Sequence, residues 1–193
     1  SSVGWAFIAE HPERLYSWTS LSIPHMKAFQ EAYRSDFDQQ RRSKYIKFFN
    51  MPFFPEFYLS YKGYNNLKNI WSAHDDEEKE AYLSVFRQSG ALRSALNWYR
   101  ANIGRHRNLT DNINFGIVEV PSLLIWGNMD MAIGRKSIVL NKQYMAGPYN
   151  LLELYAGHWL IQESFKDVSK AIIKHIKTYS LEYYEPQLGR KKK

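Results

Sequence analysis

Cysteine is absent from this sequence of 193 residues. Its absence excludes disulfide bonds, thiolate nucleophiles and zinc sites with cysteine ligands. No run of 18 apolar residues occurs either, so the sequence predicts no helix that spans a membrane. Hydrophobic residues nevertheless make up 45% of the chain and aromatic residues 16%, which is enough to build a packed core.

Clustered charge of one sign is also scarce. The formal net charge is +7, but the last four residues, 190–193, are all Lys or Arg. The other basic residues are scattered and form no stripe with stacking aromatics, which argues against nucleic-acid binding. We assign residues 181–193 to a basic tail. A solvated terminus and a membrane-surface or sorting segment both remain open as interpretations of this tail.

Two α/β segments flank a long helical segment. Residues 2–13 are small or apolar nearly throughout, which predicts a helix buried on all sides. Residues 15–23 predict a strand that Pro24 ends, and residues 26–113 have helical periodicity with a polar surface. In the last part of the chain we predict strands at 121–126 and 149–155 and helices at 134–146 and 160–179.

This pattern predicts an α/β protein with a mostly parallel sheet and a helical lid inserted into it. We assign residues 1–25 and 114–180 to the α/β core and residues 26–113 to the lid. The strand at 121–126 is apolar throughout, as in a parallel sheet that is covered on both faces. Three strands are few for such a sheet, so we expect the missing ones before Ser1.

Two residues with catalytic potential follow predicted strands. Asp130 comes four residues after Trp126, and His158 comes three residues after Tyr155, next to Gly157. The carboxyl ends of neighbouring parallel strands meet at one sheet edge, where hydrolases of this architecture hold their acid and base. Asp130 could instead cap the following helix, and His158 could be a surface histidine without a role.

Several short motifs occur in a fixed order along the chain. They are His-Pro-Glu-Arg at 11–14, Pro-His at 24–25, an aromatic and proline-rich motif at 45–57, Asn-Trp-Tyr-Arg at 97–100, Trp-Gly-x-x-Asp at 126–130 and Gly-His-Trp at 157–159. In these motifs and their order, the sequence resembles the epoxide hydrolases of the α/β-hydrolase superfamily along residues 1–179. The resemblance is strongest to the membrane-associated vertebrate paralogues of the soluble enzyme. It implies an α/β-hydrolase fold of which this chain is the carboxyl-terminal part.

The resemblance also implies roles for individual residues. Tyr45 and Tyr99 match the two lid tyrosines that hydrogen-bond the epoxide oxygen, and a phenol stays protonated at neutral pH. Asp130 would orient His158, and His158 would activate the water that hydrolyses an ester intermediate. For the tyrosines, ordinary aromatic packing in a helical lid is the alternative interpretation.

Two aromatic residues are expected to contact substrate. Trp159 follows the histidine as in the family, and Phe48 belongs to the aromatic motif of the lid. Packing in the core would explain Trp159 equally well. For Phe48, packing in the core of the lid is the favoured interpretation over contact with substrate. The resemblance implies no cofactor and no metal ion.

The aspartate nucleophile of the family is not matched by any residue of this sequence. The resemblance puts it about three residues before Ser1, and it puts an amino-terminal membrane anchor further upstream. The expected compartment is therefore the endoplasmic reticulum membrane or the cytoplasm, and the sequence predicts no oligomeric state.

Three functions remain open at this point. The first is hydrolysis of a hydrophobic epoxide, lipid-derived epoxides included, to a diol. The second is a catalytically inactive fragment or binding remnant of the family. The third is a haloalkane dehalogenase, which shares the fold but needs Trp or Asn donors for the halide, whereas the two lid tyrosines suit an epoxide.

Overall fold

The computed structural model of the protein describes residues 2–103 and 113–179. The chain divides into two compact units. The first unit combines Ser1–Arg42 with Ile113–Lys193, and the second is Ser43–Asn112. The basic tail predicted at 181–193 lies outside the described residues.

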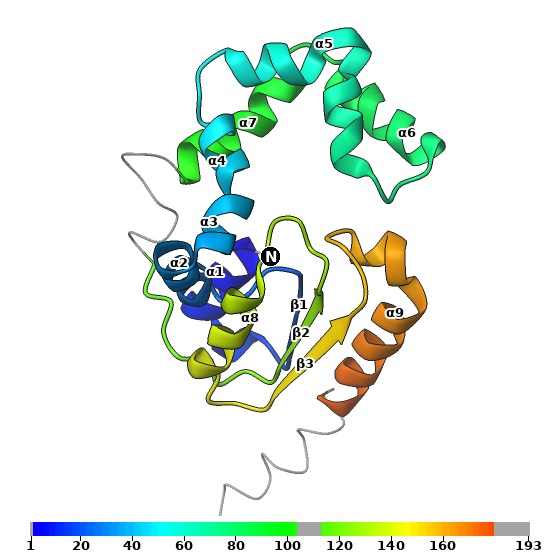
Figure 1. Cartoon of the computed structure of the whole chain (residues 1–193). Helices are drawn as coiled ribbons and strands as arrows, with labels where there is room; N and C mark the ends of the chain where they lie inside the picture. The colour runs from blue at the N-terminus through cyan, green and yellow to red at the C-terminus, as the bar shows by residue number, and fades with distance from the viewer. Residues whose placement is uncertain (1, 104–112, 180–193) are drawn as a thin grey trace, which may run out of the picture. The chain divides into compact units, whose positions relative to one another are not determined.

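The first unit contains a parallel sheet with helices on both faces (Figure 1). Its elements in chain order are α1 (Ser2–Glu10), the 3₁₀ helix η1 (Pro12–Arg14), β1 (Trp18–Leu21), α2 (Met26–Ser35), α3 (Phe37–Arg42), β2 (Ser122–Gly127), α8 (Arg135–Asn141), the 3₁₀ helix η3 (Lys142–Tyr144), β3 (Tyr149–Leu154) and α9 (Leu160–Thr178). The strand order is β1-β2-β3, and both pairings are parallel. The predicted α/β class with a parallel sheet is therefore confirmed.

The middle strand β2 is buried along its whole length, as its apolar sequence predicts. Leu123 and Ile125 pack with Leu160 and Val168 of α9 on one face of the sheet. Alternate residues of a strand point to opposite faces, so the remaining side chains of β2 face the side of α1, α2 and α8 (Figure 1). Both faces of β2 are thus covered by helices.

Helix α1 differs from the prediction of a helix buried on all sides. Only Trp5 and Ile8 are buried among its residues, and Val3 is 67% exposed. The helix covers the sheet from one side, so a single stripe of its surface is removed from water. Strand β1 also ends earlier than predicted, at Leu21, because Ser22 has a φ of 63°, which is incompatible with extended backbone.

Helices α2 and α3 belong to the first unit, although the sequence assigned residues 26–113 to the lid. The backbone N–H of His25, which precedes α2, donates to Oδ1 of Asn141 at the end of α8 (2.6 Å). Further along α2, Glu31 accepts a hydrogen bond from Gln143 (2.8 Å). These bonds join α2 to the core, so the observed boundary lies at Ser43 rather than at residue 26.

His25 is the most buried histidine of the first unit, with 1% of its surface exposed. Its Nδ1 accepts the N–H of Lys27 and so caps α2, and its ring stacks on Tyr144 with the centroids 4.6 Å apart. Burial, assisted by the positive charge of Lys27, lowers the pKa of His25 from 6.5 to about 4. The folded protein therefore holds this imidazole neutral.

A folded-state pKa below the unfolded value makes stability depend on pH. The contribution of His25 is complete above about pH 6.5 and is lost as the pH falls toward 4, up to about 3 kcal/mol in total. We expect His25→Asn, which keeps a capping oxygen but does not titrate, to flatten this part of the profile. Urea unfolding at about pH 7.5 and about pH 5 measures the difference. An equal change in stability between the two pH values in both proteins would contradict the assignment of this pH dependence to His25.

The second unit is helical throughout its described part. It comprises α4 (Lys44–Phe49), α5 (Phe54–Lys68), the 3₁₀ helix η2 (Asn69–Trp71), α6 (Asp76–Phe86) and α7 (Ala91–Asn102). Asp75 caps α6 by accepting the N–H of Glu78 (2.8 Å), as the acidic start of this helix requires. Helix α5 is kinked where residues 61–64 leave helical backbone angles.

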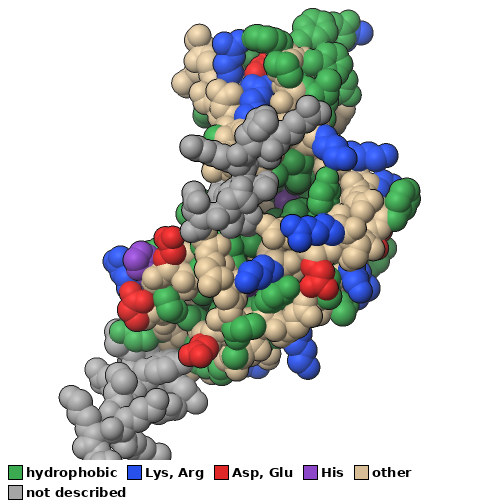
Figure 2. Space-filling model, turned by 90° about the vertical axis from the view of Figure 1, so that its left-hand side faces the viewer, with side chains coloured by type: hydrophobic (Ala, Val, Ile, Leu, Met, Phe, Trp, Pro, Cys, Tyr) green, Lys and Arg blue, Asp and Glu red, His purple; other side chains and the backbone are tan. Residues whose placement is uncertain are grey.

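The surface seen in Figure 2 carries Lys and Arg side chains spread among hydrophobic and neutral ones. Within the described ranges, no helix is both long enough and apolar enough to cross a bilayer.

Candidate active site

The turn that follows β2 carries the predicted acid. We call residues 128–134 the acid turn. Asp130 is fully buried there, and its Oδ1 accepts the backbone N–H groups of Ala132 (2.7 Å) and Ile133 (3.0 Å). Helix α8 begins later, at Arg135, and its N-cap is Gly134. Asp130 therefore does not cap α8, which was the structural alternative for this residue, but it does fix its own turn.

The turn that follows β3 carries the predicted base. We call residues 155–159 the base turn. Nδ1 of His158 lies 2.8 Å from Oδ2 of Asp130. Strands β2 and β3 are neighbours, and Gly127 at the end of β2 pairs with Leu154 at the end of β3. The parallel register therefore brings both turns to the same sheet edge, as the sequence predicts.

Gly127 makes this close approach sterically feasible. A Cβ atom at this position would overlap the backbone carbonyl oxygens of Ala156 and Gly157 in the base turn. Any larger residue at the end of β2 would push the base turn away from the acid turn.

Three further hydrogen bonds hold the base turn. The carboxylate of Glu163, in the first turn of α9, accepts the N–H groups of Gly157 (2.5 Å) and Trp159 (3.2 Å), which flank His158. The buried Ser22, directly after β1, donates its hydroxyl to the carbonyl oxygen of His158 (3.2 Å). The ring of Trp159 lies edge-on to the imidazole with the centroids 5.4 Å apart. Sequence reasoning included Trp159 but missed Glu163 and Ser22.

The geometry of the pair suits a general base. The carboxylate of Asp130 only accepts, so the bond to it assigns the proton of the neutral imidazole to Nδ1 of His158. Nε2 is then the basic nitrogen. The His158 side chain is 23% exposed whereas Asp130 is fully buried, so water can reach the base but not the acid.

The two predicted tyrosines lie together in the second unit. Tyr45 is on α4 and Tyr99 is on α7, and their rings meet edge to face with the centroids 6.2 Å apart. Both rings also contact Phe49. Burial raises the pKa of Tyr99, so this phenol keeps its proton at neutral pH and can donate a hydrogen bond.

Phe48 lies in an aromatic cluster of the same unit. Its ring contacts Phe54 (5.8 Å between centroids) and Tyr58 (5.5 Å) at nearly right angles. These contacts are typical of packing, and the predicted role of Phe48 in substrate binding stays a prediction.

An ion pair links two of the motifs that carried the family resemblance. Arg100, from Asn-Trp-Tyr-Arg, donates to both carboxylate oxygens of Glu56 (2.7 and 2.9 Å) and to the carbonyl oxygen of Met51 (2.7 Å). The Arg100 hydrogen bond is the main reason that the pKa of Glu56 is lowered. This bidentate contact fastens α7, and with it Tyr99, to the start of α5. Sequence reasoning quoted both motifs but did not connect them.

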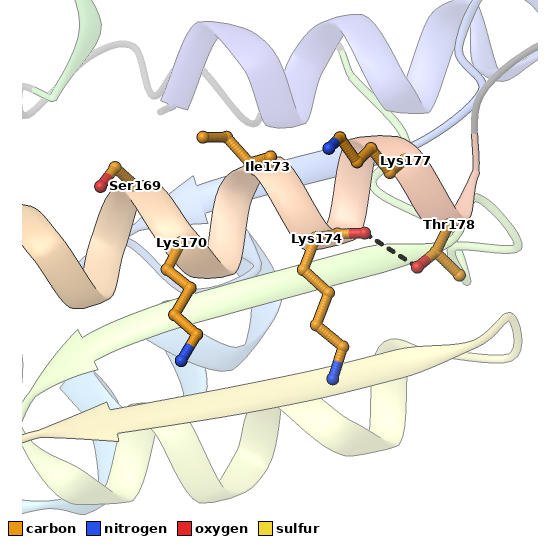
Figure 3. A pocket seen from close by; sticks show the side chains of 6 residues that line it. All are labelled: Ser169, Lys170, Ile173, Lys174, Lys177 and Thr178. Atoms are coloured by element: carbon orange, nitrogen blue, oxygen red, sulfur yellow. Dashed lines mark hydrogen bonds between the residues drawn. The ribbon is translucent and has the colours of Figure 1, made fainter.

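Two other features do not contribute to this site. A shallow hollow runs along the second half of α9 (Figure 3). His158 precedes the start of that helix. The hollow is lined by Ser169, Lys170, Ile173, Lys174, Lys177 and Thr178. Over residues 2–103 and 113–179, no three His, Asp or Glu side chains are grouped so that they could hold a metal ion.

Comparison with known proteins gives sequence relatives that cover most of this chain. It is 31% identical over 182 residues to the human protein named epoxide hydrolase 4, covering 88% of this chain and 49% of that protein. It is 28% identical over 183 residues to epoxide hydrolase 3 of Xenopus tropicalis, covering 89% of this chain and 48% of that protein. The chain thus spans about half the length of these relatives. No protein-family profile matches the sequence.

Solved structures share the fold. An epoxide hydrolase of Bacillus megaterium in complex with an inhibitor superimposes with a TM-score of 0.79 and 21% identity, over 91% of this chain and 66% of that chain. An epoxide hydrolase of the α/β-hydrolase superfamily from metagenomes of hot environments gives a TM-score of 0.74 and 20% identity, over 91% of this chain and 64% of that chain. The predicted resemblance and the α/β-hydrolase fold are therefore confirmed.

Proposed function

We propose that this chain, an α/β-hydrolase whose sequence relatives are named epoxide hydrolases, carries the acid, the base and the phenol donors of an enzyme that hydrolyses a hydrophobic epoxide to a diol. The observation that carries the proposal is the hydrogen bond between His158 and Asp130 (2.8 Å) at the ends of two neighbouring parallel strands. An acid that fixes the tautomer of a partly exposed base is the arrangement needed to activate water.

The first chemical step in this proposal opens the ring. An aspartate carboxylate that lies upstream of Ser1 attacks one ring carbon, and the bond from that carbon to the epoxide oxygen breaks. Tyr45 and Tyr99 donate hydrogen bonds to the oxygen as negative charge develops on it, and one of them supplies the proton. The elevated pKa of Tyr99 supports this role because the phenol is available as a donor at neutral pH.

The second step releases the diol. Nε2 of His158 takes a proton from water, and the water oxygen attacks the carbonyl carbon of the ester. The ester bond breaks, the diol leaves, and the upstream carboxylate is regenerated. Asp130 stabilises the imidazolium that forms on His158 during this step. The proton left on the attacking water oxygen passes to the departing oxygen of the diol, and the imidazolium returns its proton to the tyrosine that protonated the epoxide oxygen. One water molecule therefore completes the cycle.

A hydrophobic substrate is favoured by the aromatic surroundings of the two tyrosines. Phe49 contacts both rings, and Phe48 and Tyr58 extend the same aromatic cluster. Apolar and aromatic linings are typical of sites for small hydrophobic ligands. Epoxides of fatty acids and of aromatic alkenes are the substrate classes that fit this chemistry.

Turnover of an epoxide panel by the full-length protein tests the function. The panel contains a fatty-acid epoxide, an aromatic epoxide and a short aliphatic epoxide, and the diol is measured by mass spectrometry. We expect the first two epoxides to be converted to diol at rates well above those of the Asp130→Asn variant. This variant measures the background rate, because an amide cannot fix the tautomer of His158. Halide release from haloalkanes would favour the dehalogenase instead. Equal rates for both proteins would favour an inactive remnant.

A further inference from the structure

We propose that Arg42 and Gln39 of α3 are positioning residues that hold Asp130 in the orientation in which it binds His158. The catalytic consequence of this inference rests on the proposed function, whereas its structural consequence can be measured without any substrate. Neither residue belongs to the motifs that carried the family resemblance. Both are polar residues of a short helix that the sequence assigned to the lid.

Arg42 binds the backbone of the acid itself. Its Nη1 donates to the carbonyl oxygen of Asp130, and its Nε donates to Oδ2 of Asp38 one helical turn earlier (2.7 Å). Asp38 therefore fixes the guanidinium, and the guanidinium fixes the acid turn. The Arg42 side chain is 26% exposed, so these bonds are largely shielded from water.

Gln39 binds the remainder of the acid turn from a fully buried position. Its Nε2 donates to the carbonyl oxygen of Ala132 (2.8 Å). Its Oε1 accepts the N–H of Gly134 (2.8 Å) and the hydroxyl of Ser137 (2.8 Å). Both ends of one side-chain amide are thus bonded to the segment that leads from Asp130 into α8.

Together these contacts determine which oxygen of Asp130 faces the base. The carbonyl oxygens of residues 130 and 132 and the N–H of residue 134 are all bonded to α3. Oδ1 is occupied by the N–H groups of Ala132 and Ile133, so Oδ2 remains for His158. A shift of the turn by about 1 Å would stretch this 2.8 Å bond beyond hydrogen-bonding distance. Displacements of that size lower catalytic rates by up to about 100-fold.

The test compares Arg42→Met with Arg41→Met in the full-length protein. Arg41 is the matched control because it binds the other oxygen of Asp38 (2.9 Å) from an exposed position on the same helix. The first measurement is the proton NMR signal of the His158 Nδ1–H, assigned by its loss in His158→Gln. A proton donated to a carboxylate resonates far downfield. We expect this signal in the unmodified protein and in Arg41→Met, and we expect its loss or upfield shift in Arg42→Met.

The second measurement is the rate of diol formation. We expect Arg42→Met to lower kcat by about 10-fold to 100-fold, Arg42→Lys to restore part of the loss, and Arg41→Met to retain kcat within about twofold. Should Arg42→Met not fold, Asp38→Ala replaces it, because it removes the acceptor that fixes the guanidinium.

Two outcomes would overturn the inference: an unchanged Nδ1–H signal in Arg42→Met, or equal changes in Arg41→Met and Arg42→Met. A protein that turns over no epoxide but loses the signal in Arg42→Met would refute the proposed function and leave the positioning role supported.

Discussion

Replacement of His158 by glutamine is expected to leave a protein that reacts once with an epoxide and then stops. In the proposed mechanism, ring opening uses the upstream carboxylate and the two phenols of the second unit, so it does not require His158. Ester hydrolysis does require it, because Nε2 is the atom that takes a proton from water. Glutamine keeps a hydrogen-bonding side chain of similar length but has no basic nitrogen. We expect multiple turnover to fall by about 10² to 10⁴-fold, the usual contribution of a general base.

The measurement is intact-protein mass spectrometry after incubation with epoxide. The His158→Gln protein should gain the mass of one epoxide molecule, since the ring opens by addition and nothing leaves. His11→Gln is the matched control because it makes the same exchange at an exposed histidine of the first unit. Lost turnover without an adduct would indicate direct attack of water on the epoxide. Full turnover by the His158→Gln protein would show that His158 is not the general base.

Removal of the phenol oxygens of Tyr45 and Tyr99 is expected to slow ring opening, whereas His158→Gln is expected to slow ester hydrolysis. Tyr45→Phe and Tyr99→Phe keep the edge-to-face ring contact but lose the donor that stabilises the developing alkoxide. Loss of one such donor costs about 10² to 10³-fold in rate. Because ring opening itself is slowed, no covalent adduct should accumulate. The double variant should be slower than either single variant, although by less than the product of the two effects.

Single-turnover kinetics with excess protein measures this step. Tyr58→Phe is the matched control, since Tyr58 belongs to the same aromatic surroundings through Phe48 but is not one of the proposed donors. If Tyr45→Phe and Tyr99→Phe react as fast as the control, both tyrosines serve only in packing. The sequence left this alternative open.

The pairing of Asp130 with His158 could be predicted because it follows from local patterns. Two short predicted strands, each followed by a turn, suffice to place residues 130 and 158 at one sheet edge. The structure adds the distance of 2.8 Å and the burial of Asp130. Neither quantity is encoded by periodicity, since both depend on the register of β2 against β3.

The surrounding contacts could not be predicted for a physical reason. Gln39 and Arg42 are polar residues of a helix, and polar residues normally face water. Their partners lie about ninety residues later in the chain, in bonds with sequence separations of 93 and 88. Nothing in a local pattern distinguishes such a residue from a solvated one. The same ambiguity explains why the lid boundary was predicted at residue 26, since α2 and α3 have the composition of lid helices but bond to the core.

Ser22, which has left-handed backbone angles, connects the third strand of the described sheet to the candidate site. Its hydroxyl ties the end of β1 to the His158 carbonyl, while Asp130 and His158 themselves follow β2 and β3. Within the described sheet, residues that follow each of the three strands therefore meet at His158, through its backbone carbonyl and its imidazole. Sliding of one strand against its neighbour would displace His158 relative to Asp130, so partial opening of the sheet would disrupt the hydrogen bond between them. The distance between His158 and Asp130 therefore depends on the register of the β-sheet as well as on the two turns that carry these residues.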